Sequence, residues 1–169
     1  MTLIKKQKGF SLLELLLVVA VGAILLLAGL AIYRNVTNNA NVNEATRLLN
    51  VIKQETQRLY QGEGEYGTDE LNDTLITADV IPSSALSGTT IRHPYNDDVT
   101  VDGATNTFTV QFDNIPTSAC ISLGQSYNED DPDFVSLNIA GDDIADNTVA
   151  ELDDACTDSD EVNMIWTFF

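Results

Sequence analysis

An apolar run near the N-terminus constrains this chain more than any other feature of its sequence. The run extends from Phe10 to Tyr33, and Glu14 is the one charged residue inside it. A helix of about 24 residues spans about 36 Å, which is enough to cross the hydrocarbon core of a bilayer, about 30 Å thick. The sequence therefore predicts one membrane-spanning helix at this end of the chain.

The charges that flank the run indicate its orientation. Arg34 follows it, and three lysines precede it: Lys5, Lys6 and Lys8. This distribution favours a cytoplasmic N-terminus and export of the rest of the chain. A cleaved secretory signal peptide is an alternative, because small residues such as Ala28 and Ala31 are available for a cleavage site. The length of the run and its early carboxylate favour a helix that stays in the protein.

Residues 8–14, with the sequence KGFSLLE, resemble the processing signal of the type IV pilin family. The resemblance implies cleavage between Gly9 and Phe10 by a prepilin peptidase, so that residues 1–9 are a leader. It also implies N-methylation of the new amino group of Phe10. The apolar run then stays in the mature protein, which is the reverse of an ordinary signal peptide.

Glu14 needs a partner, because a charge deep in a bilayer costs about 3 kcal/mol. It lies four residues after Phe10, so the two residues share one face of a helix. After cleavage, its carboxylate can pair with the Phe10 amine of its own chain or of a neighbour. Subunits docked out of step would leave both charges unpaired, so we expect Glu14 to set the assembly register. The alternative is that its side chain only reaches the membrane interface.

The helix is expected to continue past the apolar run. Residues 35–41 are rich in asparagine and form helix weakly. An apolar stripe at helical spacing follows them, flanked by Leu48: Val42, Ala45, Leu49, Ile52 and Leu59. We expect four charged residues on the other faces: Glu44, Lys53, Glu55 and Arg58. The glycines after Gln61 predict the end of the helix, which gives an assembly helix over 10–34 and an amphipathic half over 35–61.

The remaining residues, 62–169, are expected to form a globular head. Helical turns are expected over 69–77 and a short helix over 117–123. Alternating apolar residues predict strands over 98–102, 106–113, 134–139 and 163–169. Strands separated by turns favour an antiparallel β-sheet packed on the amphipathic half of the helix. The expected fold class is therefore α+β, and the resemblance implies a type IV pilin fold.

The two cysteines, Cys120 and Cys156, resemble the ends of the disulfide-bounded C-terminal region of type IV pilins. Export from the cytoplasm permits this bridge. It would close a loop of about 37 residues and stabilise the fold by about 4 kcal/mol. Two free thiols are the alternative. The short leader and Phe10 resemble the type IVa branch, whereas residues 112–120 and 165–168 resemble the type IVb branch.

The charge of the chain limits its partners. It has 26 acidic and 8 basic residues, a net charge of −18, and Arg92 is the one basic residue after Arg58. An acidic surface repels phosphates, so we expect no direct binding of nucleic acid by the C-terminal part. It also argues against docking of this part on anionic lipid.

No set of residues supports catalysis or a cofactor. His93 is the one histidine, and a surface or structural role is expected for it. Glycine-rich phosphate loops are absent from the sequence. Three residues, Asp158, Asp160 and Glu161, are weak calcium candidates, since their spacing does not match an EF-hand. A solvated acidic face is the alternative, so we expect no enzyme, no cofactor and no resident metal.

We therefore expect a structural subunit of a type IV pilus. The resemblance implies a precursor in the bacterial inner membrane, handled there by prepilin peptidase and the pilus assembly machinery. The subunit would then polymerise as a helical homo-oligomer, an extracellular filament for adhesion, twitching motility, aggregation or DNA uptake. A minor pilin or a type II secretion pseudopilin is one alternative, and a membrane-anchored periplasmic binding domain is another.

Overall fold

The computed structural model describes residues 11–157 and 159–169. The expected leader, the cleavage site at Gly9 and Phe10, and Asp158 lie outside the described residues. The chain divides into two compact units, Met1–Thr37 and Asn38–Phe169. The second unit is called the head below.

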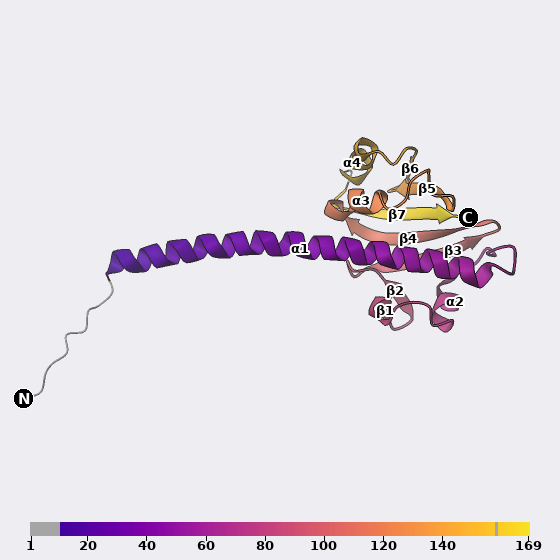
Figure 1. Cartoon of the computed structure of the whole chain (residues 1–169), viewed down its shortest axis with the longest axis horizontal. Coiled ribbons are helices and arrows are strands. Elements are labelled where there is room, and N and C mark those ends of the chain that lie inside the picture. The colour runs from indigo at the N-terminus through magenta and orange to yellow at the C-terminus, as the bar shows by residue number, and fades with distance from the viewer. Residues whose placement is uncertain (1–10, 158) are drawn as a thin grey trace, which may run out of the picture. The chain divides into compact units, whose positions relative to one another are not determined.

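One helix, α1 (Leu12–Tyr60), runs through the end of the first unit and the start of the second (Figure 1). The asparagine-rich residues 35–41, expected to be a soft middle, are helical throughout. The helix ends at Tyr60, one residue before the predicted end. Gly64 follows with a φ of 78°, a left-handed conformation that glycine adopts without steric cost.

The head contains a seven-stranded sheet in the order β1-β2-β3-β4-β7-β5-β6, and every pairing in it is antiparallel. The strands are β1 (Leu86–Ser87), β2 (Thr90–Arg92), β3 (Asp98–Ala104), β4 (Thr107–Pro116), β5 (Phe134–Ile139), β6 (Asp142–Ile144) and β7 (Glu161–Phe168). The short helices are α2 (Asn72–Thr77), η1 (Ser83–Ala85), α3 (Thr117–Gly124) and α4 (Val149–Thr157). Three short strands, β1, β2 and β6, and the helix α4 were not predicted from the sequence.

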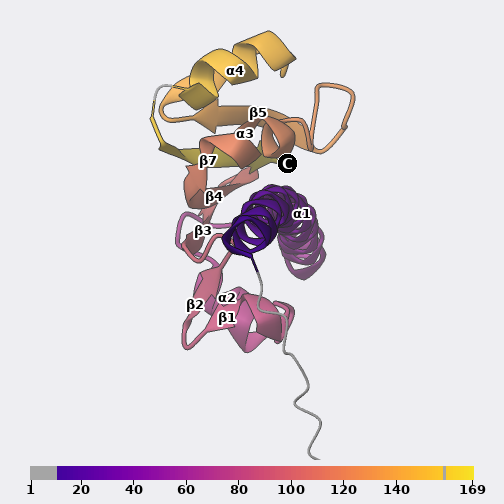
Figure 2. The same cartoon turned by 90° about the vertical axis from the view of Figure 1, so that its left-hand side faces the viewer.

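The core of the head lies between the sheet and the second half of α1. On β4, the predicted alternation is confirmed, because Phe108, Val110 and Phe112 are all fully buried. Val110 is paired across the central ladder with Trp166 of β7, which is also fully buried. Leu49 is among the α1 residues that complete this core. Figures 1 and 2 show the second half of α1 lying across one face of the sheet, so the expected α+β layout is confirmed.

The prediction that Lys53 faces away from the core was wrong. Lys53 is only 7% exposed, and its ammonium group lies 3.3 Å from a carboxylate oxygen of Asp131 and 3.5 Å from one of Asp133. Two carboxylates compensate the cost of removing this cation from water.

The two ends of the sheet carry different chain segments. Strand β1, with η1 beside it in sequence, lies at one edge, and β6 lies at the opposite edge. Figure 2 shows α4 beyond the β5 end of the sheet and the β1–β2 hairpin at the other end. The two edges of the head are therefore formed by segments far apart in the sequence.

Candidate assembly site

The α1 residues of the first unit form an apolar surface that nothing in this unit covers. Each large apolar side chain from Leu12 to Val36 is at least 50% exposed. The most apolar 18-residue window of α1 has a mean hydropathy of 3.0, with none of it buried. By length and composition this helix can cross a membrane. A helix that is apolar around its whole circumference requires lipid or other helices around it.

Glu14 lies in the first turn of this helix. Its backbone N–H donates to the hydroxyl of Ser11, 3.2 Å away, so that Ser11 caps the helix. A carboxylate in the first turn also interacts favourably with the helix dipole. Within residues 11–157 and 159–169, Glu14 has no ion-pair partner. The predicted partner, the Phe10 amine, lies outside the described residues, so the pairing stays a prediction.

A disulfide joins Cys120 of α3 to Cys156 of α4. Both residues are fully buried, and their Cα atoms are 5.9 Å apart. The two helices pack closely beside the bridge, since a Cβ atom on Gly124 would lie 2.6 Å from Leu152. The bridge therefore attaches the acidic segment around α4 to the core.

Lys53 forms a second attachment point, which was not predicted from the sequence. Its ammonium group lies 4.7 Å from the centre of the Tyr127 ring and 5.3 Å from that of Phe168. Together with Asp131 and Asp133, these rings tie the loop before β5 to α1. Helical spacing could have predicted the burial of Lys53, because it follows Leu49 by four residues and therefore lies on the same face of α1.

His93 has a structural role, within the roles expected for it. It is 2% exposed, its Nε2–H donates to the Asp113 carbonyl at 2.7 Å, and its Nδ1 accepts the Tyr95 N–H at 3.2 Å. Both bonds require a neutral ring, because the protonated ring has no acceptor. Burial lowers the pKa of His93, against the opposing effect of three nearby carboxylates, Asp97, Asp98 and Asp113.

The described part of the chain holds no cluster of three or more His, Cys, Asp or Glu side chains suited to a metal ion. Of the three weak calcium candidates, Asp160 and Glu161 are exposed. The Asp160 carbonyl accepts a bond from the Thr117 hydroxyl at 3.0 Å, which fastens the start of β7 to α3.

The head and the N-terminal segment each match a protein family. Residues 38–169 match the family described as PilS N terminal, and residues 4–30 match the prokaryotic N-terminal methylation motif. No match to the sequence was found among curated proteins.

Two solved pilin structures share the fold. The type IVb pilin from Salmonella typhi is 19% identical with a TM-score of 0.59, over 76% of this chain and 97% of that one. TcpA, a type IV pilin from Vibrio cholerae El Tor biotype, is 14% identical with a TM-score of 0.54, over 76% of this chain and 98% of that one.

These matches account for an apolar helix and a disulfide-bearing head in one chain. The family and its fold are structural rather than catalytic. The methylation motif implies processing by a prepilin peptidase and polymerisation of the product. The chain belongs to the PilS N terminal family and is a type IV pilin subunit, anchored in the membrane as a precursor and then built into a surface pilus.

Proposed function

We propose that this chain is the major subunit of its pilus. Prepilin peptidase cleaves it after Gly9, and the new N-terminal Phe10 is methylated. The exposed apolar surface of α1 from Leu12 to Val36 carries this proposal, because in a filament outside the membrane a surface of that extent is covered only by a bundle of like helices. The leader is then 1–9, the assembly helix 10–34, its amphipathic half 35–61 and the globular part 62–169.

Glu14 sets the register of the bundle in this proposal. A carboxylate among apolar helices is tolerated when it is paired, and a stranded one is strongly unfavourable. The Phe10 amine of the same or a neighbouring subunit supplies the positive charge. Subunits therefore stack at the axial spacing that brings the two groups together.

The head supplies the outer surface of the filament. Adhesion, twitching motility, aggregation and DNA uptake are the activities that such a filament serves. The whole chain has a net charge of −18, and Arg92 is its one basic residue after Arg58. This charge disfavours direct contact of the head with nucleic acid. No catalytic activity is proposed for it.

Mass spectrometry of filaments sheared from cells tests the proposal. The expected species is a dominant chain that starts at methylated Phe10 and is two hydrogens lighter than its reduced form. A cleaved chain that stays in the membrane fraction and is absent from the filaments would favour a minor pilin or a pseudopilin. An uncleaved chain would favour a membrane-anchored periplasmic domain.

A further inference from the structure

The sheet has a second face, which points away from α1. Side chains alternate between the two faces of a strand, so the residues between the buried core positions of β4, β5 and β7 lie on this second face. They are half-buried or exposed. Uncharged polar side chains occupy its centre: Thr109, Gln111, Ser136, Asn138, Asn163 and Thr167.

A shallow hollow of about 380 Å³ lies on this face, over β4, β7 and the turn between β5 and β6. Gln111, Ile165 and Asn138 line it as one row across three strands, because Ile165 is paired with Gln111 on one side and with Asn138 on the other. Asn163 lies two residues before Ile165, on the same face of β7. The hollow thus has three side-chain amides around one half-buried apolar side chain.

Each amide is held in place by bonds to its neighbours. The Oδ1 atom of Asn163 accepts the Asn114 N–H at 3.0 Å, and the Nε2 atom of Gln111 donates to Asp113 at 2.6 Å. Asn138 accepts the Gly141 N–H at 3.0 Å and donates to a neighbouring carboxylate. Among the described residues, the Nδ2 atom of Asn163 and the Oε1 atom of Gln111 have no partner. The hollow therefore offers a fixed donor and a fixed acceptor, and fixing them in advance lowers the entropic cost of binding.

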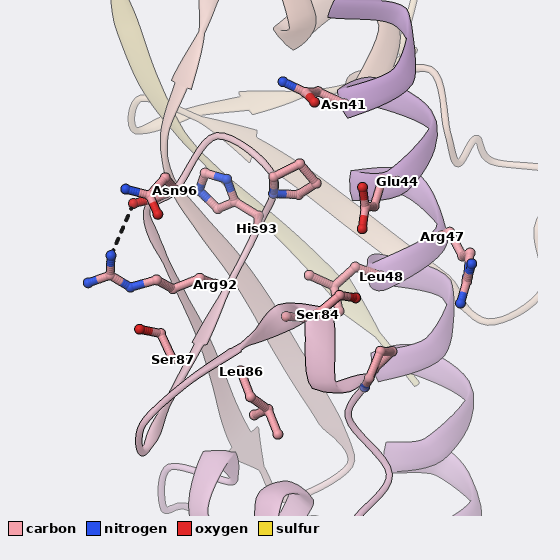
Figure 3. Close-up of a pocket in the computed structure, with 13 residues that line it drawn as sticks. Asn41, Glu44, Arg47, Leu48, Ser84, Leu86, Ser87, Arg92, His93 and Asn96 are labelled. Atoms are coloured by element: carbon pink, nitrogen blue, oxygen red, sulfur yellow. Dashed lines mark hydrogen bonds between the residues drawn. The ribbon is translucent and has the colours of Figure 1, made fainter. Parts of the chain in front are cut away.

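The charge of this face restricts what the hollow can bind. Strands β3 to β7 contain no lysine, arginine or histidine, and Glu161 lies at the rim of the hollow. The groove of about 360 Å³ between α1 and the β1–β2 hairpin differs, because Arg47 and Arg92 are among its lining residues (Figure 3). A phosphate, sulfate or carboxylate in the hollow would meet only like charge, so an anionic ligand is excluded there.

The position of the hollow excludes a peptide that adds as a strand. Such a peptide pairs with the free backbone groups of a sheet edge. The hollow instead lies over β4 and β7, which are both paired on two sides in the strand order. A wholly apolar ligand is also excluded, because it would cover the free groups of Asn163 and Gln111 without bonding to them.

We propose that the hollow is a binding site for an uncharged saccharide. Sugar hydroxyls both donate and accept, so neighbouring hydroxyls match the acceptor of Gln111 and the donor of Asn163. The C–H face of the same ring packs on Ile165. One such site binds weakly, but the repetition of the head along a filament raises the overall affinity. The inference rests on the proposed filament function and gives adhesion a ligand class and a site.

Binding of sheared filaments to immobilised oligosaccharides tests the site. The probes are neutral chains that end in galactose, glucose or N-acetylglucosamine, beside sialylated forms of the same chains. We expect retention on at least one neutral chain, with binding about tenfold weaker or less to its sialylated form, because the added carboxylate meets an acidic face.

One isosteric change tests the residues. Asn163→Asp keeps an oxygen to accept the Asn114 N–H and replaces the free donor by a charged acceptor. It should lower binding to the neutral chain about tenfold or more. Asn106→Asp is the matched control, since it makes the same change at an exposed residue of the β3–β4 turn. Both variants should form filaments at the wild-type yield, and Asn106→Asp should bind as the wild type does.

The other outcomes overturn the saccharide site. They are no retention on any neutral chain, equal retention on the sialylated form, and equal binding by wild type and Asn163→Asp. A filament yield lowered by Asn163→Asp alone would place the hollow at a contact between subunits and would also overturn it. A wild-type chain that never enters filaments would overturn the proposed function. The detergent-solubilised full-length chain, coated on beads and probed with the same oligosaccharides, would then still decide whether the hollow binds a saccharide.

Discussion

The ammonium group of Lys53 lies over the ring of Tyr127, 4.7 Å from its centre. The Tyr127 hydroxyl in turn donates to the side chain of Asn50 at 2.7 Å, so the ring is held against α1 from two sides. Burial, with the charges of Asp131 and Asp133, raises the pKa of Tyr127 above its ordinary value. The phenol therefore stays protonated and keeps donating this bond at any physiological pH.

Replacement of Lys53 by methionine should weaken the head. The change removes the cation from between two carboxylates and two rings. We expect a loss of about 2 kcal/mol in the free energy of unfolding, because cation–π contacts and half-buried ion pairs are lost. The two carboxylates regain water, which offsets part of the loss. Urea unfolding followed by the fluorescence of Trp166, the single tryptophan, measures it. Arg58→Met is the control, and an equal effect of the two changes would contradict the burial argument.

The stability of the head should depend on pH through His93. Its folded-state pKa is lowered by burial, whereas that of an unfolded histidine is about 6.5. As the pH falls, the unfolded chain therefore takes up a proton on this histidine before the folded chain does. The contribution of neutral His93 to the free energy of unfolding is fully present above about pH 6.5 and is lost as the pH falls toward the folded-state pKa. Unfolding free energies between pH 7.5 and 5.5 should show this decrease.

His93→Asn is the control for the pH dependence. It is less stable at every pH because it loses the stacking of the ring on Phe112, 5.3 Å between centres. Its stability should be flat over the same pH range, since His93 is the one histidine. An unchanged slope in this variant would assign the pH dependence to other groups.

The strands of the central sheet could be predicted because their signal is local. Phe108, Val110 and Phe112 alternate with polar residues, and this period of two is sufficient to predict β4. The short strands β1, β2 and β6 have two or three residues each, too few for a period to be seen. Their pairing is determined by contacts with the rest of the head.

Helix α4 was missed although a local signal was present. Thr148 accepts the N–H of Glu151 at 3.3 Å, which is the spacing of a capping box. The acidic composition of the segment obscured this signal. Burial of Leu152 and Cys156 then stabilises a helix of low intrinsic propensity.

The processing motif at residues 8–14 could be predicted for the same reason as β4, because its residues are consecutive and the signal is local. The groove between α1 and the β1–β2 hairpin could not be predicted from the sequence. Its lining residues come from three separate elements and a loop: Arg47, Leu48, Ser87, Arg92 and His93. A residue such as Lys53 is informative only when its distant partners, the carboxylates at 131 and 133, are known.

Removal of the disulfide should detach α4 from α3. Cys120→Ala with Cys156→Ala is expected to cost about 4 kcal/mol, the value for a loop of about 37 residues in the chain-entropy model. Limited proteolysis should then cut within residues 125–155, while the wild-type chain resists until it is reduced. Equal protease resistance of the two proteins would show that the packing of Leu152 on Gly124 is sufficient without the bridge.

Replacement of Glu14 should separate processing from assembly. Glu14→Ala removes the charge from an exposed apolar helix, and the precursor becomes easier to insert in the membrane. We expect normal cleavage after Gly9 but a filament yield about tenfold lower, because subunits lose the pairing that distinguishes one axial register from another. Glu14→Asp keeps the charge on a shorter side chain and should assemble at an intermediate level, while Glu63→Ala, in the exposed turn after α1, should match the wild type. A wild-type yield from Glu14→Ala would contradict the register role and leave the favourable interaction with the helix dipole as the role of this carboxylate.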